Sequence, residues 1–167
     1  NRGDITIKGT IKGRFGGLQG GSGNLVNCEN YGEVKIENAN AGSAIGGIAG
    51  FHSNGKKVEG CISKGNVTSV STITGGTGGL IGNMGNVDHT TGENCVVDCT
   101  IVGGSVTNAG MVVGKFNGHA EEAKRKKIVL GPLEVSGTVN GNPASASNLC
   151  GTDMYVPEYH TINATIK

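Results

Sequence analysis

A short glycine-bounded phrase, repeated at a nearly constant spacing, is the feature that most constrains the fold of this chain. The copies read GGLQG at 16–20, GGIAG at 46–50, GGLIG at 78–82 and GMVVG at 110–114, with a degenerate NLCG at 148–151. The closing glycines stand at positions 20, 50, 82 and 114, which gives steps of 30, 32 and 32 residues. A fixed period in this range indicates an array of stacked structural repeats.

A second motif follows each phrase after a connector of variable length. It reads CENYGEV at 28–34, CISKGNV at 61–67 and CVVDCTI at 95–101. We align KIVLGPL at 127–133 and the opening ITIKGTI at 5–11 with it, so that Lys127 and Ile5 take the cysteine place. These segments have the β-branched residues and the alternation of short strands, which cannot bury their apolar side alone.

Stacking the repeats would pair each strand with its equivalents and bury equivalent side chains in columns. One column contains Leu18, Ile48, Leu80, Val112 and Leu149; a second contains Cys28, Cys61 and Cys95; a third contains Val34, Val67, Ile101 and Leu133. We therefore predict an all-β β-solenoid of about five coils, most simply a right-handed parallel β-helix. It forms one domain over residues 1–167, with a partial coil at 1–14, four repeat coils at 15–148, and a degenerate coil and cap at 149–167.

Composition supports this fold and argues against several classes of function. Glycine accounts for 32 of 167 residues and aromatic residues for 4%, which favours tight corners over a core of large rings. The formal net charge is +1, so the total charge provides no basis for nucleic-acid binding. No stretch has the 18 or so apolar residues of a membrane span, and we predict no membrane insertion.

The two motifs together resemble the GLUG repeat of bacterial secreted and surface proteins. The match is best over residues 16–34, where the phrase leads to Asn27-Cys28-Glu29-Asn30-Tyr31-Gly32. The second unit has Gly60 where that asparagine stands, the third has Cys99 in place of the glycine, and the fourth loses the cysteine. The resemblance implies an extracytoplasmic bacterial protein of adhesin type, and it implies no catalytic chemistry.

The connectors are the segments in which the repeats differ, and insertions in a solenoid collect on one edge that is often the binding face. They begin at Phe51, Asn83 and Lys115, and residues 119–127 have helical composition with Glu121 and Arg125 spaced as an i,i+4 pair. We name as ligand-binding candidates the basic residues of this edge: Lys56, Lys57, Lys124, Arg125, Lys126 and Lys127. The alternative interpretation of such a run is a solvated loop.

Cysteines and histidines are the remaining candidates for chemistry. The cysteine column is either a set of metal ligands or a disulfide, or a set of small buried apolar side chains, which we favour. Bridges between Cys95 and Cys99, or from either to Cys150, stay open. The histidines (His52, His89, His119 and His160) stand at different offsets, so we expect that they do not stack, although Asp88-His89 has the groups for a metal site or an acid–base pair.

These observations lead to a non-catalytic repeat domain, with no catalytic residue, no cofactor and no metal site predicted. Its expected partner is a glycan or a host or cell-surface protein, and it is expected to belong to a larger secreted or surface protein. A carbohydrate-active β-helix enzyme is the alternative of another class, and it would require paired carboxylates. A purely structural spacer is the third hypothesis.

Overall fold

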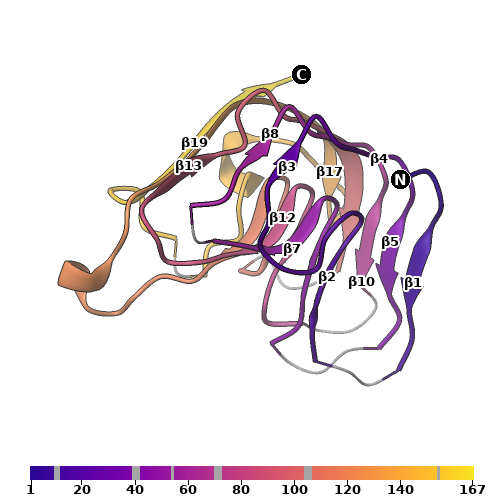
Figure 1. Ribbon diagram of the computed structural model, residues 1–167, viewed down its shortest axis with the longest axis horizontal. Coiled ribbons are helices and arrows are strands. Elements are labelled where there is room, and N and C mark those ends of the chain that lie inside the picture. Colours follow the sequence, from indigo (N-terminus) through magenta and orange to yellow (C-terminus); the bar gives the residue numbers. More distant parts are fainter. Residues whose placement is uncertain (10–11, 39–41, 54, 70–72, 104–106, 154) are drawn as a thin grey trace.

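The structure is a computed structural model that describes residues 1–9, 12–38, 42–53, 55–69, 73–103, 107–153 and 155–167. Almost all regular structure in these residues is β, and two short 3-10 helices, η1 (Glu122–Lys124) and η2 (Ala146–Asn148), interrupt it. The strands stack as successive coils of a β-solenoid, with strands of successive coils lying side by side (Figure 1). The predicted fold class is confirmed.

The strands form four sheets, which we name the large, phrase, inner and small sheets. The large sheet contains β1 (Ile5–Ile7), β4 (Glu29–Asn30), β5 (Val34–Ile36), β9 (Ile62–Ser63), β10 (Val67–Ser69), β13 (His89–Thr91), β14 (Val96–Val102), β17 (Ile128–Val139), β18 (Asn142–Pro143) and β19 (His160–Ile166). The phrase sheet contains β2 (Arg14–Gly16), β6 (Ala44–Gly46), β11 (Thr77–Gly78) and β15 (Ala109–Gly110). The inner sheet contains β7 (Ala49–His52), β12 (Ile81–Met84) and β16 (Val113–Phe116), and the small sheet contains β3 (Leu25–Val26) and β8 (Val58–Glu59).

The repeated phrase stacks in register through all five copies, as the sequence predicts. Backbone hydrogen bonds run from the amide of Leu18 to the carbonyl of Ile48, then from Ile48 to Leu80, from Leu80 to Val112, and from Val112 to Leu149. The three middle side chains are fully buried, and Leu149 is 8% exposed. Burial of each such side chain stabilises the fold by about 1.5–3 kcal/mol.

The paired glycines of the phrase are needed because the backbones of neighbouring strands come very close there. A Cβ on Gly46 would lie 2.6 Å from the amide nitrogen of Gly82 in the next coil. A Cβ on Gly47 would meet the carbonyl oxygen of Gly79 and the hydroxyl of Ser63 from the facing strand. Glycine in the phrase therefore permits the close approach of neighbouring coils.

A left-handed corner precedes each of the three stacked cysteines. Asn27, Gly60 and Asn94 have φ values of 52°, 59° and 55°. Glycine and asparagine are the residues that adopt this conformation at least cost. The exchange of asparagine for glycine in the second unit thus preserves the same backbone turn.

The register of the fourth unit differs from our alignment by six residues. Strand β17 pairs Gly137 with Cys99 and Val139 with Ile101, and the amide of Glu134 donates to the carbonyl of Cys95. Leu133, not Lys127, therefore lies beside Cys95, and Val139 is the residue of the valine column.

The opening strand shows the same six-residue displacement. Ile5 pairs with Val34 and so lies in the valine column, where we had aligned Ile5 with the cysteines. Ile11, which we had aligned with the valines, lies outside the described residues. Gly3 then takes the glycine place, because a Cβ on Gly32 would meet the carbonyl of Gly3.

Candidate functional site: the connector edge

The connectors of the second, third and fourth coils lie on one side of the solenoid and are bonded to one another. We call the described residues of 51–59, 83–93 and 115–127 the connector edge. The side-chain amide of Asn86 donates to the carbonyl of Lys124 at 3.0 Å and accepts from the amide of Lys126 at 3.1 Å. A carboxylate oxygen of Asp88 accepts from the amide of Lys127 at 2.8 Å. The fourth connector, which contains η1, extends furthest from the coils (Figure 1).

The second and third connectors are joined in the same way closer to the core. The hydroxyl of Thr91, which is 1% exposed, accepts from the amide of Val58 at 2.8 Å. Strand β13 of the third connector then pairs in parallel with the first residues of β17. The connectors thus continue the stacking of the coils outward and form one surface.

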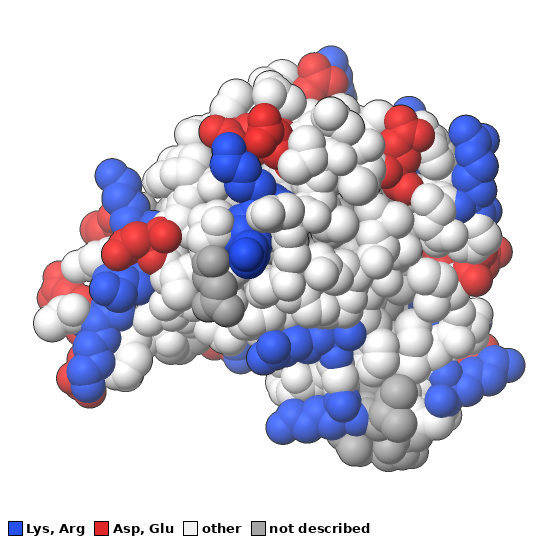
Figure 2. Space-filling view, in the orientation of Figure 1, with Lys and Arg blue, Asp and Glu red and all other residues white. Residues whose placement is uncertain are grey.

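Three of the six predicted ligand-binding cations are paired with acids on the same edge. Lys57 lies 3.4 Å from Glu59 and Lys124 lies 2.8 Å from Glu121. Lys126 lies 3.7 Å from Asp88. Figure 2 shows basic and acidic side chains interspersed at this end of the molecule. The four consecutive cations therefore form no uninterrupted positive patch.

The other three cations differ in their surroundings. Arg125 donates to the carbonyls of His119 and Ala120, and its guanidinium lies 5.9 Å from the centre of the Tyr159 ring. Lys56 and Lys127 make no ion pair within the part of the chain that the structure describes. The predicted helix is shorter than expected: only Glu122–Lys124 is helical, and Glu121 pairs with Lys124 in place of Arg125.

Two of the histidines share a register position, although they do not stack on each other. His89 pairs with Ile128, and Ile128 pairs in turn with His160, so Ile128 lies between the two histidines. The Nε2 atom of His52 lies 3.1 Å from the Nε2 atom of His89. Connectors of unequal length gave these residues different offsets from the phrase, which concealed the register.

The burial of His52 could have been predicted from its position in the repeat. It stands two residues after a closing glycine, as do Met84 and Phe116, and the three residues are paired in the inner sheet. All three are fully buried. Burial of the His52 ring lowers its pKa to about 4, and the partial burial of His89 lowers the pKa of that ring as well. Both rings are therefore neutral at pH 7.

The Lys56 carbonyl lies beside this pair of rings. Its oxygen is 2.7 Å from Nε2 of His52. Nδ1 of His52 is buried and has no hydrogen-bond partner among the described residues. The pair joins the second connector to the third by polar contacts in a largely desolvated site.

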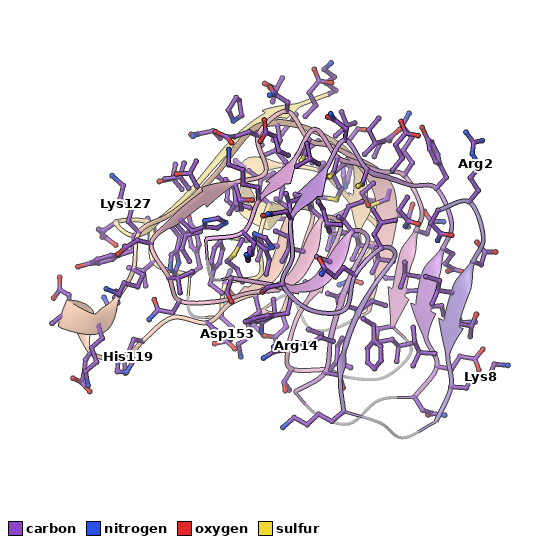
Figure 3. The ribbon with its side chains drawn as sticks, in the orientation of Figure 1. Arg2, Lys8, Arg14, His119, Lys127 and Asp153 are labelled. Carbon is purple, nitrogen blue, oxygen red and sulfur yellow. The ribbon has the colours of Figure 1, made fainter. Side chains whose placement is uncertain are left out.

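His160 is packed differently from the other two. Its ring stacks on Phe116 with centroids 4.3 Å apart, and Nδ1 accepts from the amide of Val156 at 3.1 Å. Burial, reinforced by the positive charge of Arg125, lowers the pKa of His160 to about 4. His119 lies apart on the protruding connector, where its Nδ1 accepts from the amide of Glu121 (Figure 3).

The cysteine column forms as predicted, and it lies in the core directly inside the connector edge, where the Cys61 thiol contacts the carbonyl of Glu59 and the Cys95 thiol contacts the carbonyl of Val58. Cys61 and Cys95 are fully buried and Cys28 is partly exposed. The thiol contact between Cys61 and Cys95 lowers the pKa of Cys61 and raises that of Cys95. All five cysteines are free thiols, including the Cys95, Cys99 and Cys150 for which bridges had stayed open.

Within the described ranges, no group of three or more His, Cys, Asp or Glu side chains is placed to hold a metal ion. The same residues include no helix with the length and apolar character needed to cross a membrane. Comparisons with protein-family models, with curated proteins and with solved structures found no match. The geometry of the connector edge is therefore the basis of any functional interpretation.

Proposed function

We propose that this chain is a non-catalytic, extracytoplasmic repeat domain of a bacterial surface or secreted protein, which binds a partner through the connector edge. One observation carries the proposal. The frame of each coil repeats the same buried columns, while the segments that differ between coils are bonded into a continuous outward surface. A rigid frame with varied segments on one side is how solenoids present binding surfaces.

The bonding between connectors supports a preformed surface. Asn86 and Asp88 hold the backbone of the fourth connector at three positions, Lys124, Lys126 and Lys127. A surface that is already ordered loses little conformational entropy when a partner binds. Such a surface suits recognition of an exposed glycan or of a folded protein on a cell.

The charges of the edge favour a partner that has negative groups. Lys56, Arg125 and Lys127 make no ion pair among the described residues, and Arg125 is engaged by backbone carbonyls. No acid of the chain therefore has to be displaced for an anionic group to approach Lys56 or Lys127. Lys127 also borders a shallow hollow with Asp88, His89, Thr90 and Val129. An acidic glycan, with carboxylate or sulfate groups, is the ligand class that we infer.

Two alternatives make different demands on the same surface. A carbohydrate-active enzyme requires two carboxylates that converge on a glycosidic bond, and Asp88 of this edge is engaged by the amide of Lys127 and the ammonium of Lys126. A structural spacer requires nothing of the connectors beyond stability. Binding that depends on connector residues separates the proposal from both.

The test is a glycan array that includes uronic-acid and sulfated glycans, followed by titration of any ligand found. The variant Lys56→Ser/Lys127→Ser removes two cations from the edge, and Lys8→Ser/Lys64→Ser makes the same charge change on the large-sheet side. Lys8 and Lys127 lie at opposite ends of the molecule (Figure 3). We expect at least a tenfold loss of affinity in the first variant and no change in the second.

Two results would contradict the proposal. Equal losses in both variants would indicate attraction to net charge alone. Absence of binding to every acidic glycan, and to cell-surface protein preparations, would leave the spacer as the better account.

A further inference from the structure

We propose that His52, His89 and the backbone carbonyl of Lys56 form a binding site for one divalent transition-metal ion, which joins the second and third connectors. The inference does not depend on the proposed glycan binding. It begins from three heteroatoms that meet at Nε2 of His52: Nε2 of His89 lies 3.1 Å from that atom, and the carbonyl oxygen of Lys56 lies 2.7 Å from it.

Hydrogen atoms alone do not satisfy this arrangement. A neutral imidazole has at most one hydrogen on Nε2, and that hydrogen lies in the ring plane and points in one direction. Nε2 of His52 makes both close contacts with at most one hydrogen. If that hydrogen points at the Lys56 carbonyl, it does not point at His89; if it points at His89 or is absent, no hydrogen lies along the short contact with the carbonyl. A metal ion that accepts a lone pair from each atom removes this conflict.

The distances fit coordination by imidazole. Metal–nitrogen bonds to histidine are about 2.0–2.1 Å long. Two nitrogens 3.1 Å apart can both bond to one ion at that length, with an angle of about 100° at the metal. Neutral imidazole nitrogens with a carbonyl oxygen suit zinc, copper(II) or nickel(II) and not calcium or magnesium.

The rings are held in place before any ion binds. His52 is fully buried, and its backbone is paired with that of Met84 within the inner sheet. His89 is fixed by the parallel register of β13 with β17. Burial lowers the pKa of both rings, so both are neutral at neutral pH. Neither ring therefore has to release a proton to solvent before it binds an ion.

Solvent reaches the site from one side. His89 is partly exposed and lines the shallow hollow with Asp88, Thr90 and Lys127. Water from this hollow would complete the coordination shell of an ion held by three protein atoms. The protein supplies two side-chain ligands only, which is consistent with the absence of any described cluster of three or more ligating side chains.

The test uses untagged protein whose accessible thiols have been alkylated with iodoacetamide, so that cysteines do not compete. Zinc chloride is titrated by calorimetry, and a copper(II) complex is prepared for electron paramagnetic resonance. We expect one ion per chain, hyperfine splitting from two nitrogens in the copper spectrum, and a higher melting temperature with zinc.

The variant His89→Gln is the main test, because this partly exposed residue can be changed without opening the core. Affinity for zinc should fall at least tenfold and the two-nitrogen splitting should disappear. His119→Gln, which removes a histidine of the protruding connector, should leave both unchanged. Circular dichroism checks that each variant is folded.

Three results would overturn the proposal. The first is that the wild-type protein binds neither zinc nor copper, which would mean that the two rings are joined by a hydrogen bond only. Equal affinity of wild type and His89→Gln would place the ion elsewhere. Loss of binding in His119→Gln would assign it to an exposed histidine.

Discussion

At the scale of single residues, the repeat is maintained by positions where only a small side chain or an unusual backbone angle fits. The phrase glycines are set by contact with neighbouring strands, since a Cβ on Gly47 would meet the carbonyl of Gly79 and the hydroxyl of Ser63. The corner before the cysteines is set by backbone angle, and asparagine or glycine satisfies it at Asn27, Gly60 and Asn94. Each requirement belongs to a different part of the coil.

We predict that Gly47→Ala lowers the free energy of unfolding by about 3 kcal/mol, because the added methyl group forces two strands apart in a closely packed interior. Urea denaturation measures the change. Gly21→Ala is the matched control, since no atom lies within 4 Å of a Cβ built there, and it should change stability by less than about 0.5 kcal/mol. Equal effects of the two variants would contradict the close-approach argument.

At the scale of elements, strand β19 covers β17 at one edge of the large sheet. It pairs in parallel with β17, and its first residue, His160, stacks on Phe116 of β16. The neutral ring is required, because Nδ1 accepts the hydrogen bond from the amide of Val156. Protonation of His160 would replace this acceptor with a second donor.

We predict that stability falls as the pH is lowered from about 6.5 to about 4. Burial lowers the pKa of His160 to about 4 in the folded protein, whereas the unfolded chain protonates near 6.5. Between these values the unfolded state binds more protons, so acidification favours it, by about 2–3 kcal/mol in total from this residue.

The variant His160→Phe keeps an aromatic ring against Phe116 and has no group that titrates. Urea denaturation at pH 7, 6, 5 and 4.5 should therefore show a shallower loss of stability than in the wild type. The same pH dependence in both proteins would show that His160 is not the residue responsible.

At the scale of the whole molecule, each coil contacts its neighbours in the stack, and the two ends differ from the middle. The middle copies of the phrase are fully buried at Ile48, Leu80 and Val112, while Leu18 in the first copy is partly exposed. In such an array the stability is a sum of coil terms and nearest-neighbour terms, and end coils open first.

We predict that amide hydrogen exchange is slowest in the middle coils and fastest in the first. The amides of Ile48 and Leu80 should be among the most protected, and that of Leu18 should exchange at least tenfold faster, although all three form equivalent hydrogen bonds. Hydrogen exchange followed by mass spectrometry or NMR measures this. Uniform protection along the stack would instead indicate a single cooperative unit.

The sequence by itself determined the solenoid, its period and the apolar column of the phrase. These features depend on the spacing of motifs along the chain and on a pattern of buried side chains that every coil shares. It did not determine the register of the first and fourth units. Both displacements are of six residues, and an even shift in a strand keeps the same side chains on the same face. Hydrophobic alternation therefore could not distinguish the two alignments, and the hydrogen bonds between coils decided them.

The tertiary structure alone decided which connector residues meet. His52 and His89 stand 37 residues apart in connectors of unequal length, so no common offset related them. Likewise, the ion pair of Lys126 with Asp88 joins two connectors, whereas Lys57 and Lys124 pair with acids in their own connectors. Spacing in the sequence predicts contacts where every coil repeats the same path, and it loses that power where the paths differ in length.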